Sequence, residues 1–393
     1  MKGWKEFRLD EMSKIIMGLS PSGETYNEEG IGIPLLNGPT EFGETYPNCT
    51  VYTTDPKRLC KKGDLIFCVR GSTTGRMNWA DKQYATGRGV CSITGTDDLT
   101  TKFIKHLLTL NLLALLQITG GGTFPNLRKE DLNGFKFKAP AHYRKIASIL
   151  SAYDDLIENN LKRIKLLEEI AQRTYEDWFV KFRINGKQLK LNEGTALPEG
   201  WEEKPINSIV DIISGYPFKS SEYISDGVYK IVTIKNVQDG FFVPITTDTL
   251  AEVPSKVKFE QKLETGDIIL SLTGNVGRIC LVYGENYLLN QRVAKIIPLN
   301  EANKCFVYSM LRSKTMITKL ENLSNGAAQQ NLSPINMGNM NICIPKDDVL
   351  RQFSKIMEGT IDLICKLNLN NALLKESRDI LLPRLMSGVI EVG

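Results

Sequence analysis

Two long stretches of the chain repeat apolar residues at intervals of seven, the spacing at which helices pack along one another. We expect the first helix to run from about Tyr143 to Val180 and the second from about Val349 to Leu382. Asp347 or Asp348 is expected to cap the second helix, and Pro383 to end it. The positions expected to face a partner helix are Leu150, Ile157, Ile164 and Leu167 in the first helix, and Ile364, Leu367, Leu374 and Leu381 in the second.

Shorter elements precede each long helix. The segment from Ile269 to Tyr283 alternates apolar and polar positions and is broken by Thr273-Gly274-Asn275, which predicts a hairpin. Helical patterns follow over residues 101–118 in the first half and 301–323 in the second. Charged and polar residues interrupt the apolar run within 103–118, so it predicts a core helix and not a membrane span.

The same order of segments occurs twice along the chain. GDLIFCVRGSTTGR from Gly63 is similar to GDIILSLTGNVGR from Gly266, and Asp155-Leu-Ile157 is repeated at Asp362-Leu-Ile364. We therefore predict an α+β fold with two similar domains, each followed by a long helix. Two-fold pseudo-symmetry would make the helices antiparallel, so we predict an antiparallel coiled coil. The alternative is that each helix lies only on its own domain.

The predicted boundaries follow from this repeat. A first mixed domain covers residues 1–140 and a central helix 141–185. Residues 186–200 are rich in glycine and proline and are expected to form a linker. A second mixed domain covers 201–346, and the second helix with the tail covers 347–393.

Composition adds few constraints. Hydrophobic residues make up 42% and charged residues 24%, as in ordinary globular proteins, and the net charge is only +4. A strong non-specific nucleic-acid binder usually has a larger basic excess, so any DNA binding would depend on local patches or on partner subunits. The eight Cys and two His show no metal-ligand spacing. Scattered cysteines and a charged N-terminus favour the reducing cytoplasm.

No catalytic motif in the sequence is convincing. The glycine loop Gly71-Ser-Thr-Thr-Gly75-Arg76 is shorter than a nucleotide-binding loop and has no lysine. Asn331-Leu-Ser-Pro334 lacks the second proline and the aromatic residue of an adenine-methyltransferase motif. Asp248, Glu260 and Lys262 have the residue types of a metal-dependent nuclease, but solvated strand edges often carry such residues. No catalytic and no metal-binding residue is therefore predicted.

Binding residues are predicted instead at glycine turns and polar loops, where side chains can reach phosphates or base edges. Each has an ordinary alternative, namely an exposed hairpin arginine, a plain polar loop or a salt-bridged structural arginine. The candidates in the first half are Ser72, Thr73, Arg76 and Arg88. Those in the second half are Lys219, Ser220, Thr273, Asn275, Arg278, Gln291, Arg292, Gln329, Gln330 and Asn331.

The two halves differ outside their shared framework. Arg88-Gly89-Val90 corresponds to Gln291-Arg292-Val293, and Gly120-Gly-Gly-Thr123 stands where the second half has Gly326-Ala-Ala-Gln-Gln330. Glutamine and asparagine can contact adenine edges with two hydrogen bonds. The first half lacks them there, so its contacts would have to be different.

Four segments of the second half carry a resemblance to a known family. They are LPEGWEEKPINSIVDIISGYPFKS from Leu197, GDIILSLTGNVGR with LLNQRVAKIIP from Leu288, GAAQQNLSPINMGNMNICIP from Gly326, and LLPRLMSGVIEV from Leu381. In this order, repeated over nearly the whole chain, they resemble the specificity subunit of type I restriction-modification systems.

The resemblance implies that the mixed domains are target-recognition domains and that the long helices are spacers. It also implies a non-catalytic subunit that reads a bipartite asymmetric site in double-stranded DNA. The expected partners are two adenine-methyltransferase subunits, which would carry S-adenosylmethionine, and, in a full restriction assembly, translocase-nuclease subunits. No cofactor and no membrane association are expected for this chain. The alternatives are a stand-alone DNA methyltransferase or nuclease, and a structural adaptor without a DNA role.

Overall fold

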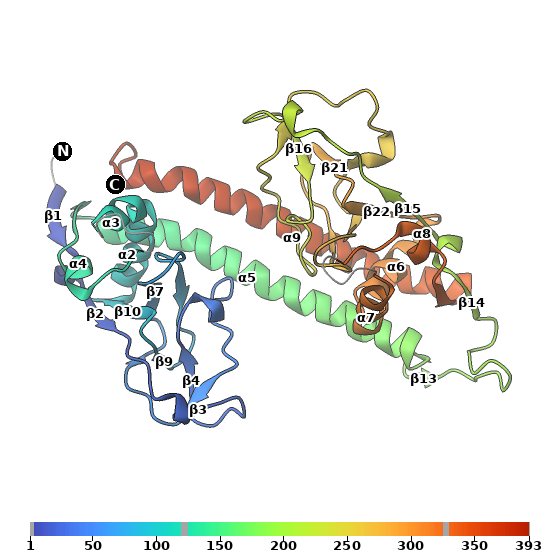
Figure 1. The fold of residues 1–393 in the computed structure, drawn as a ribbon, viewed down its shortest axis with the longest axis horizontal. Coiled ribbons are helices and arrows are strands. Elements are labelled where there is room, and N and C mark those ends of the chain that lie inside the picture. Colours follow the sequence, from blue (N-terminus) through green and yellow to red (C-terminus); the bar gives the residue numbers. More distant parts are fainter. Residues whose placement is uncertain (1–3, 119–124, 325–329, 393) are drawn as a thin grey trace. The chain divides into compact units, whose positions relative to one another are not determined.

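Short strands and helices alternate along the chain in the computed structural model, which describes residues 4–118, 125–324 and 330–392. Their contacts divide the chain into two units (Figure 1). The first unit comprises Met1–Glu158 with Leu374–Gly393, and the second comprises Asn159–Leu373. Both long helices thus contribute residues to both units. The mixture of helices and strands confirms the predicted α+β class.

The first unit contains a four-stranded antiparallel sheet in the order β2-β10-β7-β8, a five-stranded sheet β3-β5-β4-β9-β6 and the pair β1-β11. In the five-stranded sheet β4 and β9 are parallel. The strands are β1 Trp4–Arg8, β2 Ser13–Met17, β3 Tyr26–Asn27, β4 Ile33–Leu36, β5 Tyr52–Thr53, β6 Leu59–Cys60, β7 Leu65–Cys68, β8 Met77–Trp79, β9 Tyr84–Thr86, β10 Val90–Gly95 and β11 Lys136–Pro140. The short helices are α1 Leu9–Met12, α2 Asp98–Leu110, α3 Leu112–Gln117 and α4 Lys129–Asn133.

The second unit repeats this topology. Its sheets have the orders β15-β22-β19-β20, β17-β16-β21-β18 and β14-β23, and β16 is parallel to β21. The strands are β14 Glu202–Pro205, β15 Val210–Ser214, β16 Tyr229–Val232, β17 Thr249–Leu250, β18 Lys262–Leu263, β19 Ile268–Ser271, β20 Ile279–Leu281, β21 Tyr287–Leu289, β22 Val293–Pro298 and β23 Asn341–Ile344. The short helices are α6 Lys304–Leu311, α7 Lys314–Leu323 and α8 Pro334–Gly338. The pairing of β19 with β20 confirms the predicted hairpin.

Equivalent backbone hydrogen bonds stabilise each unit at matching glycines. Gly18 donates its backbone N–H to Val90 O (2.9 Å), and Gly215 donates to Val293 O (3.2 Å). A Cβ atom on Gly18 would lie 2.1 Å from Gly87 O, and one on Gly215 would lie 2.3 Å from Asn290 O. Only glycine lets the chain pass this close to the neighbouring strand turn. The same close approach therefore requires glycine at both positions.

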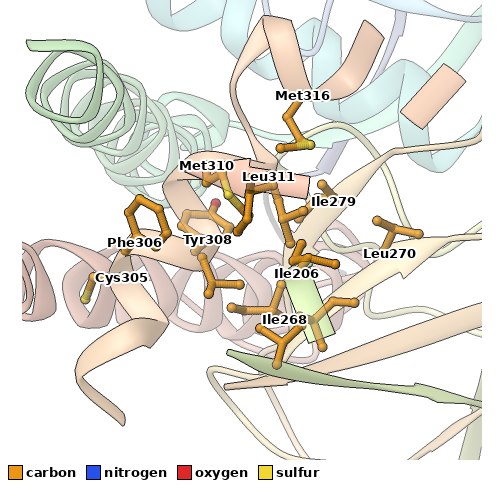
Figure 2. Packing of buried hydrophobic residues seen from close by; sticks show 14 of the residues in the cluster. Ile206, Ile268, Leu270, Ile279, Cys305, Phe306, Tyr308, Met310, Leu311 and Met316 are labelled. Carbon is orange, nitrogen blue, oxygen red and sulfur yellow. The ribbon is translucent and has the colours of Figure 1, made fainter. Parts of the chain in front are cut away.

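The core of the second unit lies between its central sheet and helix α6. The β19 side chains Ile268 and Leu270 share one buried cluster with the α6 residues (Figure 2). Ile269, on the opposite face of the strand, is buried in another cluster. The residues of α6 from Cys305 to Leu311 are all buried. Residues 301–323 form two helices, α6 and α7, and not one, because Ser313 between them has an extended backbone and its side chain caps α7 by accepting from the Met316 N–H.

The first long helix, α5, runs over Tyr143–Tyr175 and continues as a π-helical turn, Glu176–Val180. This wider turn directs Trp178 and Phe179 into the core of the second unit. The Trp178 ring lies 5.7 Å from Phe353 of the second long helix, and Phe179 lies 4.8 Å from Phe306 of α6. The end of the helix is therefore fixed by aromatic packing.

The second long helix, α9, runs over Asp347–Met386, and both its ends differ from the prediction. Asp347 and Asp348 lie inside the first turn instead of before it, where their charges still face the positive end of the helix dipole. Pro383 does not end the helix, because only one hydrogen bond is missing this close to the end; Ser387 still donates to Pro383 O at 2.9 Å.

The segment between α5 and β14 is folded onto the second unit. A two-stranded hairpin, β12 Arg183–Ile184 and β13 Lys187–Gln188, turns at Asn185 and Gly186, which both have positive φ. This is the Asn-Gly turn favoured in two-residue hairpins. The neighbouring Phe182, Leu189 and Leu197 pack against the core of the second unit, so the glycines and the proline here serve tight turns.

Candidate nucleic-acid interface

Three of the predicted polar segments in the second unit lie side by side. Leu272, at the end of β19, donates its backbone N–H to Arg292 O (3.0 Å) and accepts one from Leu332 (2.8 Å). Thr273 and Asn331 then form an isolated antiparallel bridge. The hairpin turn 273–278, the strand turn 291–292 and residues 330–331 therefore form one continuous polar surface.

The first unit contains the equivalent arrangement. Val69 donates to Gly89 O (2.9 Å) and accepts from Leu127 (2.9 Å), and Arg70 bridges Asn126 as Thr273 bridges Asn331. The Arg70 Nε donates to Asn126 Oδ1 at 3.3 Å. Sequence reasoning missed Arg70 as a candidate, although its position directly after the repeated strand could have indicated it.

The exposure of the predicted side chains suits contact with a ligand. Thr73, Thr273 and Arg278 are half-buried. The exposed residues are Ser72, Arg76, Arg88, Lys219, Ser220, Asn275, Gln291, Arg292, Gln330 and Asn331. Gln329 lies outside the described residues, as do Gly120–Thr123 and Gly326. These side chains are amides, hydroxyls and cations, which can contact both phosphates and base edges.

Lys219 and Ser220 come shortly after Tyr216, whose backbone oxygen accepts the N–H of Gln291 at 3.2 Å. They begin the short 3-10 turn Ser220–Glu222, in which Glu222 donates its backbone N–H to Lys219 O. Tyr223 likewise donates to Ser220 O at 3.3 Å. The preceding Phe218 is buried in a separate apolar cluster with Ile231 and Leu288. These two residues are therefore anchored in their own turn, which follows the pairing of Tyr216 with the strand turn at Gln291.

Arg76 and Arg278 occupy equivalent places, and each contacts the loop that follows a parallel strand of its unit. The Arg278 guanidinium donates to Gln238 Oε1, and the Asn275 side chain lies beside the same guanidinium. The Arg76 guanidinium donates to Pro39 O at 3.4 Å and lies 6.0 Å from the centre of the Phe42 ring. A guanidinium has five N–H donors, so each arginine can brace its loop and still donate to a ligand.

The loop over residues 233–243 in the second unit is held firmly from its other side. Arg312, at the end of α6, forms an ion pair with Asp239 and lies 3.7 Å from the Glu168 carboxylate of α5. Burial raises the pKa of Glu168, against the opposing effect of Arg312. Asn236 also donates to Val243 O (2.8 Å) and Ile245 O (3.0 Å). The loop that supports Arg278 is thus tied to the long helix.

The predicted helix-packing residues fall into both units. Leu150 lies in the core of the first unit, with Leu381 partly buried against it. Ile164, Ile364 and Leu367 form a buried cluster in the second unit, with Leu167 beside it. Ile157 is buried, and Leu374 is half-buried.

Asp154 on α5 is the centre of an ionic cluster in the first unit. It accepts from Lys105 on α2 (2.6 Å) and Arg378 on α9 (2.6 Å), and His106 Nε2 lies 3.3 Å away. Burial alone would raise the pKa of Asp154, but His106 and Lys105 hold it below its ordinary value. Burial lowers the pKa of His106, despite the nearby carboxylate. We therefore take His106 as neutral near pH 7, with Lys105 and Arg378 as the charged partners.

Other reactive chemistry is scarce in the described part of the chain. Across residues 4–118, 125–324 and 330–392, no three His, Cys, Asp or Glu side chains gather as a metal site would need. No helix in these ranges has the length and apolarity to span a membrane. All eight cysteines are free thiols, and burial raises the pKa of Cys60 to about 12 and of Cys305 to about 11, so these two stay protonated.

Comparison with known proteins agrees with this arrangement. Residues 1–169 and 198–375 match the family described as the type I restriction modification DNA specificity domain. The MjaIX specificity subunit of Methanocaldococcus jannaschii is 26% identical, over 100% of this chain and 94% of that protein. The HindI specificity subunit of Haemophilus influenzae is 23% identical, over 99% of this chain and 100% of that protein.

A solved structure shares the fold. The type I restriction-modification S subunit from M. genitalium aligns with a TM-score of 0.61 at 20% identity, and the alignment covers 99% of this chain and 97% of that one. The sequence resemblance and the fold therefore agree over the whole chain.

Proposed function

The chain belongs to the type I restriction-modification DNA specificity family, and we propose that it reads a bipartite, asymmetric DNA site through one polar surface on each unit. The observation that carries this proposal is that the two units have the same backbone hydrogen bonds around Val69 and Leu272 but different side chains at the equivalent positions. At the same backbone positions the first unit presents Arg70 and Arg88, and the second presents Thr273 and Gln291. Equal frames with different donors and acceptors would select different base pairs.

Each polar surface would combine two kinds of contact. Arg76 and Arg278 would donate to phosphates or to guanine, while their loops hold them in place. Gln291, Gln330 and Asn331 offer amides, which suit adenine edges in the second half-site. With a net charge of only +4, phosphate contacts by partner subunits would add to the affinity.

We further infer that α5 and α9 form the antiparallel coiled coil expected from the seven-residue repeat. Contacts inside each unit support it. In the second unit Asn160 contacts Asn371 and Trp178 contacts Phe353, so residue numbers rise along one helix as they fall along the other. In the first unit Asp154 contacts Arg378 in the same sense. The target-recognition domains would then be 1–140 and 201–346, with spacers 141–185 and 347–393.

A second apolar stripe on the two helices supports the proposal that methyltransferase subunits dock there. Large apolar side chains remain exposed at positions that repeat in sevens or are matched between the helices. They are Ile149, Leu156, Leu166 and Ile170 on α5, and Ile356, Leu373 and Ile380 on α9. Two matched stripes would receive two equivalent partners. The partners would carry S-adenosylmethionine, a translocase-nuclease could join them, and the assembled complex would act on cellular DNA in the cytoplasm.

The modular function can be tested by substitutions in one surface. Arg278→Ala and Gln330→Ala should weaken recognition of one half-site, by about 1–3 kcal/mol for each specific base interaction that the substitution removes. The matched control, Arg76→Ala, should affect only the other half-site. Methylation maps of host genomes, made with complexes assembled from each variant, would show which half relaxes. A variant that weakens both halves equally would contradict the proposal.

The alternative of a stand-alone methyltransferase or nuclease predicts different behaviour of the purified chain. An enzyme would bind S-adenosylmethionine or cut DNA by itself, and Glu260 or Lys262 substitutions would abolish cleavage. A specificity subunit should bind no S-adenosylmethionine in calorimetry and should need its partner for methylation. A structural adaptor without a DNA role would give no gel shift with any DNA, alone or with the partner.

A further inference from the structure

A buried amide pair interrupts the apolar seam between α5 and α9 in the second unit. Asn160 donates its side-chain N–H to Asn371 Oδ1 at 2.9 Å, and both residues are only 4% exposed. The adjoining contact is apolar, with Ile164 packed in one cluster with Ile364 and Leu367. The Asn371 Nδ2 has no hydrogen-bond partner among the described residues, so the pair does not serve packing well.

The internal repeat gives these positions a special relation. Residues 207 apart are equivalent, as Asp155 is to Asp362. Asn160 is therefore equivalent to Leu367, and Ile164 to Asn371. The two layers, Asn160 with Asn371 and Ile164 with Leu367, would be copies of each other under the pseudo-symmetry, but one is polar and the other apolar.

This asymmetry distinguishes correct from incorrect helix pairing. The repeat makes α5 and α9 alike, so α5 could also pair with the α5 of a second copy of this chain, and α9 with α9. In an α5–α5 pair of the same register, Asn160 would face Ile164 twice. In an α9–α9 pair, Asn371 would face Leu367 twice. Each buried amide would then be without its partner, which weakens pairing by roughly tenfold per amide.

We propose that the Asn160–Asn371 pair selects α5–α9 pairing within one chain and rejects pairing of like helices between two copies. Its benefit rests on the proposed function, because a dimer of like helices would place identical reading surfaces together and would read symmetric sites. The selection itself depends only on helix packing, so it can be tested without DNA.

Three full-length variants separate the possibilities. Asn160→Leu with Asn371→Ile removes the amide pair and gives both layers the same residues. Adding Ile164→Asn and Leu367→Asn to that variant moves the pair to the equivalent layer. Asn160→Leu alone leaves Asn371 without a partner and should lower the unfolding midpoint, whereas the double variant should recover at least the wild-type midpoint.

The measurement is chain mixing. Two differently tagged copies of each variant are unfolded and refolded together, one tag is captured, and the co-captured tag is quantified. We expect at least tenfold more mixed species for the double variant than for the wild type, and a return to the wild-type amount for the variant with the moved pair. Equal mixing in the double variant and the wild type would overturn the proposal, as would undiminished mixing after the pair is moved. Failure of DNA recognition would leave this result unchanged.

Discussion

At the scale of single residues, the matched backbone hydrogen bonds of the two units require glycines, because there is no room for a Cβ atom. Gly18 and Gly215 are needed because a Cβ atom would lie within 2.3 Å of a backbone oxygen in either unit. Backbone cannot move aside as a flexible side chain can. The need for these two glycines comes from the neighbouring strand turn, which lies close to them only in the folded chain.

We predict that Gly18→Ala and Gly215→Ala each lower the free energy of unfolding by about 1–3 kcal/mol or more, through overpacking. Gly23→Ala is the matched control, because its Cβ would meet nothing within 4 Å and its φ is not positive. The control should change stability by less than about 0.5 kcal/mol. Urea unfolding of the three variants measures their free energies of unfolding. If Gly18→Ala left this free energy unchanged, the neighbouring strand turn would have to be able to shift.

Sequence reasoning proposed binding candidates but not the residues that support them. Thr273 and Arg278 lie in the glycine turn between β19 and β20, and Asn331 was chosen as part of a polar loop, so local sequence indicated all three. Arg312 and Asp239 were missed, because they are 73 positions apart and meet only after folding. A contact between two side chains far apart in the sequence leaves no periodic pattern by which it could be predicted. The same holds for the contact between Asn160 and Asn371.

At the scale of elements, the Asp154 cluster joins three helices of the first unit. Lys105 and His106 come from α2, Asp154 from α5 and Arg378 from α9. The pKa of both Asp154 and His106 is lower in the folded chain than in an unfolded one. The unfolded chain therefore binds more protons as the pH falls, and acid favours unfolding.

We predict that the unfolding free energy falls from pH 7 toward pH 5, as His106 becomes protonated in the unfolded chain but not in the folded one. His106→Gln should flatten this part of the profile. Asp154→Asn should remove a further loss that begins below about pH 5, and should itself lower stability at pH 7 by about 1–3 kcal/mol. Urea titrations at several pH values measure both. A wild-type profile that rises on acidification would contradict the assignment of a neutral His106.

The long helices were the most predictable elements, because seven-residue spacing extends over many turns. Their ends were less predictable. Pro383 lies inside α9 because it removes only one hydrogen bond so near the helix end. A π turn follows α5 because aromatic packing, which local sequence does not encode, fixes that end. The segment 186–200, predicted as a linker from its glycines, begins in a tight Asn-Gly hairpin.

At the scale of the whole molecule, the repeat was the strongest signal and led to the correct fold class and family. The repeat predicted only some of the residues that come together in the polar surface of each unit. Lys219 and Ser220 stand in a 3-10 turn of their own, and local sequence did not indicate that the preceding Tyr216 pairs with Gln291. Polarity identifies exposed loops, but strand pairing decides which loops are neighbours.

The proposed spacer role predicts that half-site spacing follows helix length. Seven residues inserted in α5 within Lys162–Glu169, together with seven in α9 within Asp362–Leu369, would extend each helix by ~10 Å and preserve the seam on both sides. The preferred spacing should grow by about three base pairs while the half-site sequences stay the same. Insertions of four residues in both helices would shift the seam and should impair folding or partner docking. Methylation maps of assembled complexes report the spacing, and an active seven-residue variant with unchanged spacing would exclude the helices as the ruler.

The matched hydrogen bonds of the two units join backbone atoms. Mutations can therefore change the side chains around them without removing these hydrogen bonds. One crossover in the gene for α5 would exchange an entire reading surface and leave the other as it was. Recognition of a new half-site could therefore arise in one genetic step, without an intermediate protein that fails to fold. Misaligned recombination between the two repeats would instead place the same side chains in both units, and the proposed function then predicts recognition of a symmetric site.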